Sequence, residues 1–359
     1  MAVLPTLPTD TMRSIASSIA TSLTTLMRRL ALDPFTVGLM LMVLLASLLP
    51  ASGETAVVLG HITTVAIGLL FFLHGAKLSR EALVAGLTHW RLHLLVLACT
   101  FIMFPLMGLV IEPLALKLLT PELTMGILFL CVLPSTVQSS IAFTALARGN
   151  VAAAVCSATA SNFLGIFLTP LMVGALVVQG AQASGGSGLA QVWKIVEQLL
   201  LPFLAGQLLR PWIGAFIDRH KPVLRYVDQG SILLVVYMAF SESVSEGLWQ
   251  HISSVTLLVL VVLSCLMLAL ALGLSVWMSR RLGFSKEDEI TIVFCGSKKS
   301  LASGVPMAKV LFAPSTLGMI ILPLMLFHQV QLMVCAVLAQ RWARRAPEPQ
   351  QAAPVSLTR

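Results

Sequence analysis

One apolar stretch, Phe294–Phe312, concentrates the residues that could carry chemistry. It reads FCGSKKSLASGVPMAKVLF and combines three lysines with serines, glycines and a proline. Moving a lysine into hydrocarbon costs at least about 2.5 kcal/mol, so such lysines are rare in membrane spans and usually mark an ion or substrate path. The stretch therefore indicates a broken membrane helix at the transport site of a secondary transporter.

Lys298 and Lys299 are the main candidates in this stretch. They lie about eight residues past the expected cytoplasmic start of the span, a depth of roughly 12 Å at about 1.5 Å per residue. Because adjacent helical residues point about 100° apart, we expect one lysine to face the site and the other to anchor the helix. We expect Lys298 to balance the charge of the substrate. Snorkelling to the headgroups is the alternative, and it is favoured for Lys309 near the outer end.

A second polar cluster, PSTVQSS, lies within Leu133–Arg148. Its amide and hydroxyl groups could bind an ion or a polar substrate, although in most membrane helices such groups only bond across helix interfaces. With neighbours in adjoining segments, the candidate substrate- and ion-binding residues are Lys298, Lys299, Ser297, Ser300, Gln138, Ser139, Ser140, Thr144, Ser157, Thr159 and Thr100. The expected helix breaks are Pro134, Gly296, Gly304 and Pro306.

The composition indicates an all-α polytopic membrane protein. The chain is 57% hydrophobic and only 11% charged, with a mean hydropathy of +0.94, whereas soluble domains are roughly a quarter charged. The net charge of +8 comes from basic residues in short loops, so the expected partner is the lipid bilayer and not nucleic acid. The six cysteines form no CxxC pair, and no set of His, Cys and Asp has metal-ligand spacing. No enzyme is indicated, and no cofactor is expected beyond sodium or a proton as coupling ion.

Ten segments meet the length of about 20 apolar residues that a membrane span requires. They lie near residues 35–50, 56–75, 92–112, 124–145, 151–178, 190–209, 229–247, 254–278, 290–312 and 315–340. Most of the 23 lysines and arginines fall in loops that this count places on the cytoplasmic side, together with both termini. The asymmetry predicts a multi-pass protein of the cell (inner) membrane.

Ten spans divide into two five-helix repeats. Because five is odd, the equivalent halves, 33–178 and 190–342, would lie in the membrane with opposite orientation. We expect residues 179–189 to form a Gly/Ser-rich link, residues 1–32 to form a cytoplasmic segment that suits a surface helix, and residues 343–359 to form a disordered cytoplasmic tail. The fourth segment of each half is the most interrupted one, which is the best sequence pointer to a binding site at the bilayer midplane.

Three stretches resemble the bile acid:sodium symporter (SBF-like) family, in particular its bacterial YfeH-like branch. They are DPFTVGLMLMVLLASLLP, the TALARGN run before the fifth segment, and GSKKSLASGVPMAKVLF, and the likeness covers about residues 30–340. The resemblance implies a panel domain of helices one, two, six and seven. It implies a core domain of the other six, in which the unwound fourth and ninth helices cross at the site. The implied substrate is an amphipathic organic anion taken up with sodium.

Residue-by-residue comparison with this family departs at the sodium ligands. Ser140 matches the serine of a Ser-Asn pair in helix four, but Ile141 falls where the asparagine would be. The family glutamine of helix three aligns with Thr100. In helix nine the family glutamate aligns with Phe294 and the following glutamine with Lys298. A lysine ammonium could therefore replace the bound cation, which would make transport sodium-independent or proton-linked.

The sequence thus predicts a secondary active transporter that moves a small amphipathic organic anion by alternating access. Gln138, Ser139 and Ser140 would bind the anion from the repeat opposite Lys298. The alternative is a membrane regulator or receptor-like protein that keeps the transporter fold without transport. An ion channel is not favoured, since the chain has no ring of charge and no filter motif. The sequence leaves open the substrate, the coupling ion, the direction of transport and the oligomeric state.

Overall fold

The computed structural model describes residues 34–77, 89–177, 196–245 and 247–345, and the regular structure in these ranges is entirely helical. The all-α prediction is therefore confirmed for this part of the chain. The surface helix expected within residues 1–32, the link at 179–189 and the tail beyond residue 345 lie outside the described residues.

The helices lie, in chain order, on either side of residues 178–195. The first half contains α2 (Pro34–Leu48), α3 (Gly53–Lys77), α5 (Trp90–Ala98), α6 (Phe104–Leu118), α7 (Pro121–Val132), α8 (Val137–Leu146) and α9 (Val151–Met172). The second half contains α11 (Leu201–Arg219), α12 (Lys221–Ser245), α13 (Leu248–His251), α14 (Ser254–Arg281), α15 (Lys286–Gly296), α16 (Leu301–Leu311) and α17 (Pro314–Ala343). A π-helical turn, Cys99–Met103, joins α5 to α6 without a gap.

Seven of the described helices are long and apolar enough to cross a membrane, and an eighth span results if the bent pair α7–α8 counts as one. This count is lower than the expected ten for two physical reasons. α2 has 15 residues, or about 22 Å of helix, which is shorter than the roughly 30 Å hydrocarbon core. α15 and α16 have 11 residues each, so neither spans alone. Helices occupy all ten expected segments, while the ten-span inverted repeat stays a prediction.

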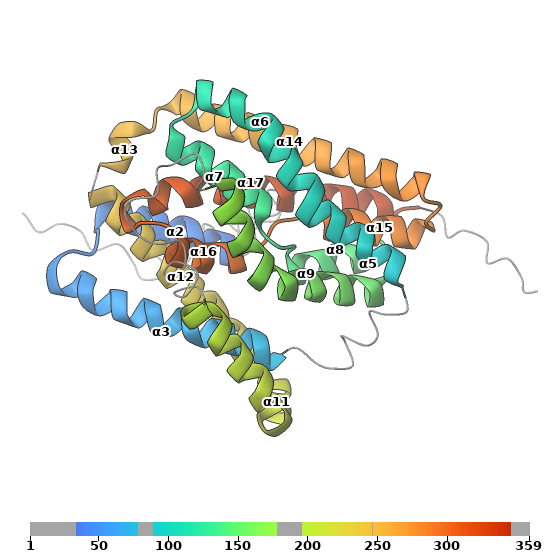
Figure 1. The fold of residues 1–359 in the computed structure, drawn as a ribbon, viewed down its shortest axis with the longest axis horizontal. Helices are drawn as coiled ribbons and strands as arrows, with labels where there is room; N and C mark the ends of the chain where they lie inside the picture. The colour runs from blue at the N-terminus through green and yellow to red at the C-terminus, as the bar shows by residue number, and fades with distance from the viewer. Residues whose placement is uncertain (1–33, 78–88, 178–195, 246, 346–359) are drawn as a thin grey trace, which may run out of the picture.

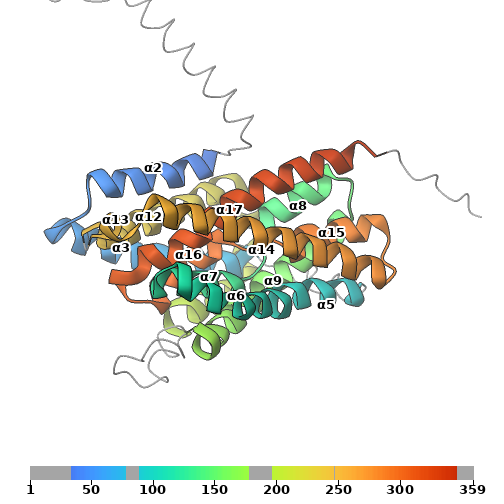
Figure 2. The same ribbon diagram turned by 90° about the horizontal axis from the view of Figure 1, so that it is seen from above.

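The helices α2, α3, α11 and α12 form a first helix group. α3 lies along α11, and α12 contacts α2 and α3 (Figures 1 and 2). The contact between α3 and α11 depends on two glycines, since a Cβ on Gly75 would lie 2.0 Å from the carbonyl oxygen of Phe203. A Cβ on Gly206 would lie equally close, 2.0 Å from the carbonyl oxygen of Phe72. Small residues of this kind let helix backbones approach closely inside a membrane.

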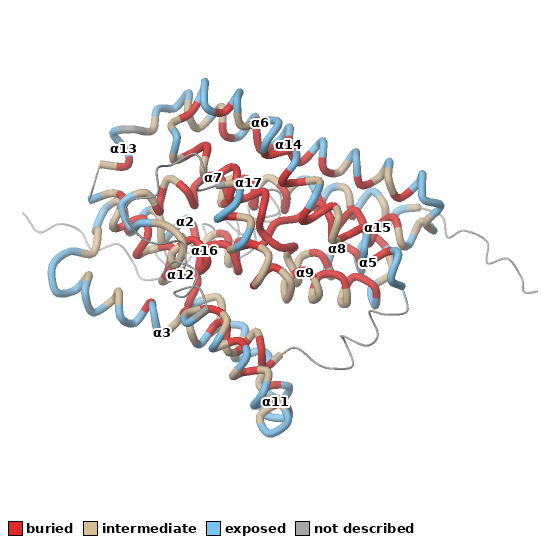
Figure 3. Tube along the Cα trace, in the orientation of Figure 1, coloured by how far each residue is buried: buried red, intermediate tan, exposed pale blue. Residues whose placement is uncertain are grey.

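The helices α5 to α9 and α14 to α17 form a second helix group. α17 contacts α7, α8, α14 and α16, and α12 joins the two groups by packing on α16 and α17. In Figure 3 the buried residues concentrate along α7, α15, α16 and α17, whereas α3, α11 and α14 carry long exposed stretches. Many exposed side chains on these outer helices are large and apolar, such as Val65, Leu208 and Val255. Apolar outer faces suit contact with lipid, in agreement with the predicted membrane location.

Candidate functional site

Two helix interruptions meet inside the second helix group. The pair α7–α8 is bent by 60° at its junction, and residues 297–300 separate α15 from α16. The backbone N–H of Ser300 donates to the carbonyl oxygen of Pro134 over 2.9 Å. The hydroxyl of Thr136 donates to the carbonyl oxygen of Lys299 over 2.9 Å. Polar groups near one break are thus satisfied by the other, as backbone in a membrane interior requires.

The ammonium group of Lys299 occupies a cage of three backbone carbonyl oxygens, which we call the carbonyl cage. Its Nζ donates over 2.8 Å to Thr100, 2.9 Å to Cys131 and 2.8 Å to Leu133. These bonds use all three donors of the ammonium group. The Lys299 residue is fully buried, and its Nζ lies 4.2 Å from the centroid of the Phe104 ring. A carbonyl cage of this kind could hold any small monovalent cation, and here the chain supplies the cation itself.

The Thr100 carbonyl is available because the helix is irregular at the π-helical turn. In a regular α-helix the N–H of Phe104 would donate to the carbonyl oxygen of Thr100. Here it donates to the carbonyl oxygen of Cys99 instead. The next residue, Pro105, has no N–H to offer. A single proline after a π-helical turn therefore frees one of the three oxygens.

The other two carbonyls are free because α7 ends beside them. In a continuous helix the N–H of Ser135 would bond to Cys131, but it donates instead to the hydroxyl of Ser161 over 3.1 Å. Leu133 lies past the end of α7, in extended backbone before Pro134. The helix break predicted at Pro134 thus has a definite consequence, which is to present two carbonyl oxygens to Lys299.

Lys298 points into a different environment from Lys299. Its Nζ lies 3.8 Å from the centroid of the Phe143 ring and 5.5 Å from that of Phe294. The residue is fully buried, and its Nζ has no hydrogen-bond partner in the part of the chain that the structure describes. From the sequence, Lys298 is the lysine expected to balance the substrate charge. The structure places it among aromatic rings, outside the cavity described below, because the backbone after α15 turns its neighbour toward the carbonyl cage.

Gln331 of α17 holds the backbone of the second break and was not among the predicted residues. Its Oε1 accepts from the N–H of Lys299 over 3.0 Å, and its Nε2 donates to the carbonyl oxygen of Lys299 over 3.0 Å. The Gln331 Nε2 also lies 2.8 Å from Nδ1 of His328. A His and a Gln three residues apart in an apolar segment were the sequence signal that could have identified this pair.

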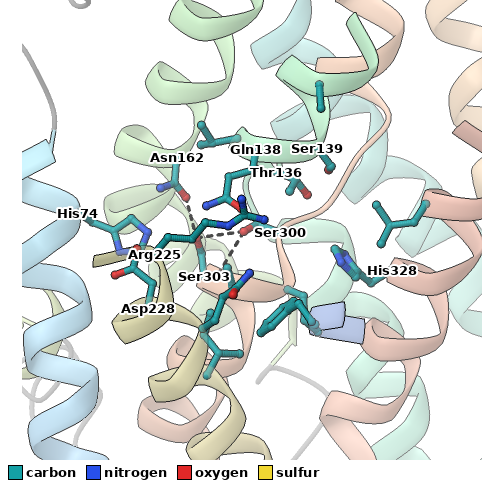
Figure 4. A pocket seen from close by; sticks show the side chains of 18 of the residues that line it. His74, Thr136, Gln138, Ser139, Asn162, Arg225, Asp228, Ser300, Ser303 and His328 are labelled. Carbon is teal, nitrogen blue, oxygen red and sulfur yellow. Dashed lines mark hydrogen bonds between the residues drawn. The ribbon is translucent and has the colours of Figure 1, made fainter. Parts of the chain in front are cut away.

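A cavity of about 820 Å³ lies between the two helix groups (Figure 4). Its walls come from α2, α3 and α12 on one side and from α8, α9, α16 and α17 on the other. Four predicted ligands line it, namely Gln138, Ser139, Thr159 and Ser300. The structure describes no group of three or more His, Cys, Asp or Glu side chains that could hold a metal ion in residues 34–77, 89–177, 196–245 and 247–345.

The remaining predicted ligands lie outside the cavity lining. They are Thr100, Ser140, Thr144, Ser157, Ser297, Lys298 and Lys299. The hydroxyl of Ser140 donates to the Phe294 carbonyl oxygen over 2.8 Å, which ties α8 to α15. The hydroxyl of Ser157 lies 2.6 Å from Nδ1 of His93. These two hydroxyls join helices to each other, the alternative that the sequence analysis left open for such residues.

Gly304 and Pro306 are not at a helix break. Both lie inside α16, which is continuous from Leu301, so the interruption falls at residues 297–300. Gly304 is required for packing, since a Cβ there would lie 2.5 Å from a side-chain carbon of Leu133. Gly296, also expected to be a helix break, is the last residue of α15, so it lies directly before the interruption.

Lys309 forms an ion pair across the boundary between the helix groups. Its Nζ lies 2.8 Å from both carboxylate oxygens of Glu242 on α12. On the same part of α12, the hydroxyl of Ser243 accepts from the N–H of Gly318 over 2.8 Å. The cavity borders the first turns of α12, and these contacts close its later turns against α16 and α17. The snorkelling expected for Lys309 is therefore replaced by a contact that links the two groups.

Glu242→Gln should destabilise this closed contact. Removing one charge from a partly buried pair, whose side chains are 17% and 27% exposed, is expected to cost roughly 1–3 kcal/mol. The melting temperature of the purified protein should fall by several degrees. Asp218→Asn is the matched control, because its pair with Lys221 is largely exposed and its loss should leave the melting temperature unchanged. Equal melting temperatures for the two variants would contradict a structural role for the Glu242 pair.

Comparison with known proteins gives one consistent result. The model of the SBF-like CPA transporter family matches residues 33–344. An uncharacterized protein of Pseudomonas aeruginosa is 67% identical over 313 residues, which cover 87% of this chain and 93% of the relative. The putative symporter YfeH of Escherichia coli is 57% identical over 319 residues, covering 89% and 95%. Sodium/bile acid cotransporter 7 of Danio rerio is 31% identical over 324 residues, covering 87% and 94%.

Proposed function

The chain belongs to the SBF-like CPA transporter family, and on that premise we propose that it moves a small amphipathic organic anion across the membrane by alternating access. The proposal of such a substrate is supported by the cavity between the two helix groups, whose walls combine polar with apolar side chains. Ligand sites at the interface of packed units are common, and their occupant is exposed to either side when the units move. We take the first helix group as the panel and the second as the core of this movement.

The proposed layout has ten spans in two inverted repeats, residues 33–178 and 190–342, with both termini in the cytoplasm. The two interruptions support it, because they occur at corresponding positions, in the fourth segment of each half. In transporters with inverted repeats, broken helices at matching positions bring the positive ends of half-helices to the substrate site. Here α8 and α16 both begin at the cavity, with Thr136, Val137, Ser300 and Leu301 in its wall.

The observation that carries the proposal on coupling is the carbonyl cage around Lys299. The Danio rerio relative is named for sodium and bile acid. For this chain we propose a substrate anion that resembles a bile acid, but we do not propose that sodium binds in the carbonyl cage. Three carbonyl oxygens at 2.8–2.9 Å already surround the ammonium group of Lys299, and an additional cation would be repelled by it. This arrangement supports transport that needs no sodium at this cage, with a proton as the candidate for coupling.

A thermal-shift experiment with taurocholate tests this proposal. Because ligand binding to the folded state raises the melting temperature, taurocholate should stabilise the protein in lipid nanodiscs. The shift should be the same in sodium chloride and in choline chloride at equal ionic strength. A shift that appears only with sodium would contradict sodium-independent binding. Counterflow of taurocholate in proteoliposomes without sodium is the expected transport result, and binding without counterflow would contradict the transporter function.

A further inference from the structure

Arg225 is the uncompensated charge in the cavity wall. Among the residues that the structure describes, three charged side chains line the cavity, namely Lys77, Arg225 and Asp228. Lys77 and Asp228 form an ion pair with each other, so their charges cancel. Arg225 makes no hydrogen bond and no ion pair with any residue that the structure describes, and in Figure 4 its side chain extends from α12 into the cavity. The lining therefore carries a net positive charge at one guanidinium group.

The facing wall offers hydrogen-bond donors that are not used elsewhere. Gln138 is exposed to the cavity, and the hydroxyl of Ser139 is buried without a hydrogen-bond partner among the described residues. Both lie in the first turn of α8, where the helix dipole favours negative charge. Ser300 and Ser303 differ from these two, since their hydroxyls are committed to the Ser303 backbone N–H and to Asn162. An uncommitted amide, an uncommitted hydroxyl and a guanidinium group are what an anionic oxygen group needs.

We propose that the cavity recognises organic monoanions, and that it holds their carboxylate or sulfonate group between Arg225 on α12 and Gln138 and Ser139 on α8. This rests on the proposed function and adds the residue that selects the charge. A planar guanidinium group donates two parallel hydrogen bonds to such an acid group. One uncompensated charge suits a single negative charge, because the described lining offers no second free cation to pair with another one, and Arg225 and Gln138 are both exposed to an entering anion. The apolar part of the anion would lie against Phe35, Ile232 and Leu332.

This arrangement also connects recognition to movement. Arg225 belongs to the first helix group, and Gln138 and Ser139 belong to the second. An anion that accepts hydrogen bonds from both would stabilise one relative position of the two groups. A neutral analogue with the same apolar body would contact the same walls without that link.

The test compares cholate with its neutral methyl ester, each below its micellar concentration, on protein in nanodiscs. Because Arg225→Gln removes charge-assisted hydrogen bonds to the acid group, it should weaken cholate binding at least tenfold and leave binding of the ester unchanged. Arg225→Lys should retain part of the affinity, since it keeps the charge but loses the planar fork. Arg219→Gln is the matched control, because Arg219 is an exposed arginine on α11 outside the cavity lining. The melting temperature without ligand verifies that each variant is folded.

The outcomes separate this inference from the proposed function. If wild-type protein and Arg225→Gln bind cholate equally, the inference is overturned while organic anion binding stands. The inference is also overturned if Arg225→Gln weakens cholate and ester alike, since Arg225 would then shape the cavity and not recognise charge. If the wild-type protein binds neither cholate nor taurocholate, the proposed function and the inference fail together.

Discussion

Replacing Lys299 with methionine is expected to lower the melting temperature by roughly 6 °C or more and to abolish transport. The variant keeps the length of the side chain but leaves the carbonyls of Thr100, Cys131 and Leu133 without a donor. Each unsatisfied buried polar group costs about 1–3 kcal/mol, so the combined loss is at least roughly 3 kcal/mol. A loss of 1 kcal/mol corresponds to about 2–4 °C in a domain of a few hundred residues. Differential scanning fluorimetry of the purified protein measures this change.

Lys117→Met is the control for this substitution, because Lys117 is an exposed lysine on α6. Its melting temperature should stay close to that of the wild-type protein. A Lys299 variant as stable as this control would show that the carbonyl cage does not need its ammonium group.

The shorter variant Lys299→Ala tests whether the emptied carbonyl cage can bind a cation from solution. It removes the ammonium group together with most of the side chain, so a hydrated site with three carbonyl oxygens becomes available. Oxygen ligands of this kind suit hard cations, and a bound cation stabilises the folded state by mass action. We expect sodium to raise the melting temperature of Lys299→Ala relative to choline, and to have no such effect on the wild-type protein. Equal values in sodium and choline would contradict the view that Lys299 stands in for a bound cation.

Much of the fold could be predicted because its signals are local. Helices occupy every expected segment, since runs of apolar residues specify them directly. The interruptions fall within the two stretches chosen from polar residues and prolines; Pro134 lies inside the first, and Gly296 lies directly before the second. Gly304 and Pro306 were misassigned because glycine and proline have two uses in helices. At Gly304 the close approach of Leu133 explains the residue, with no break in the helix.

The role of Lys299 could not be predicted from residue types. The carbonyl cage consists of backbone oxygens, which every residue has, and they become available only through a π-helical turn and the end of α7. Sequence reasoning compared side chains, and it therefore favoured Lys298, which aligns with a side-chain ligand in the resembled family. Which of two adjacent lysines faces which wall depends on the backbone torsions of four residues between helices. No periodicity extends across such a segment.

Arg225 was missed because its charge had another explanation. Residue 225 falls between the expected spans 190–209 and 229–247, in a loop expected on the cytoplasmic side, where basic residues set the orientation of a membrane protein. In the structure α12 begins at Lys221, so Arg225 lies in the second turn of a helix that borders the cavity. The ion pair between Glu242 and Lys309 was also not predicted. The two residues are 67 positions apart in the sequence, and they meet because α12 packs on α16.

Replacing Lys298 with methionine is expected to raise the melting temperature by several degrees, the opposite of the result for Lys299. Taking an ammonium group out of water costs several kcal/mol, and at Lys298 no hydrogen bond offsets that cost among the described residues. The contact with the Phe143 ring returns only about 2 kcal/mol. A methionine would fill the same space between Phe143 and Phe294 without the desolvation penalty, and its sulfur packs well against aromatic rings. Thermal unfolding of Lys298→Met and Lys299→Met, measured side by side, shows whether each substitution raises or lowers the melting temperature.

A stabilising Lys298→Met variant would also indicate why the lysine is present. A group that lowers stability and lacks a partner in one state is explained if it acquires a partner in another state of the transport cycle. We therefore expect Lys298→Met to combine a higher melting temperature with slower counterflow of taurocholate, whereas Lys117→Met should change neither. A lower melting temperature would mean that the aromatic contacts outweigh desolvation. Unchanged counterflow would show that Lys298 has no part in transport.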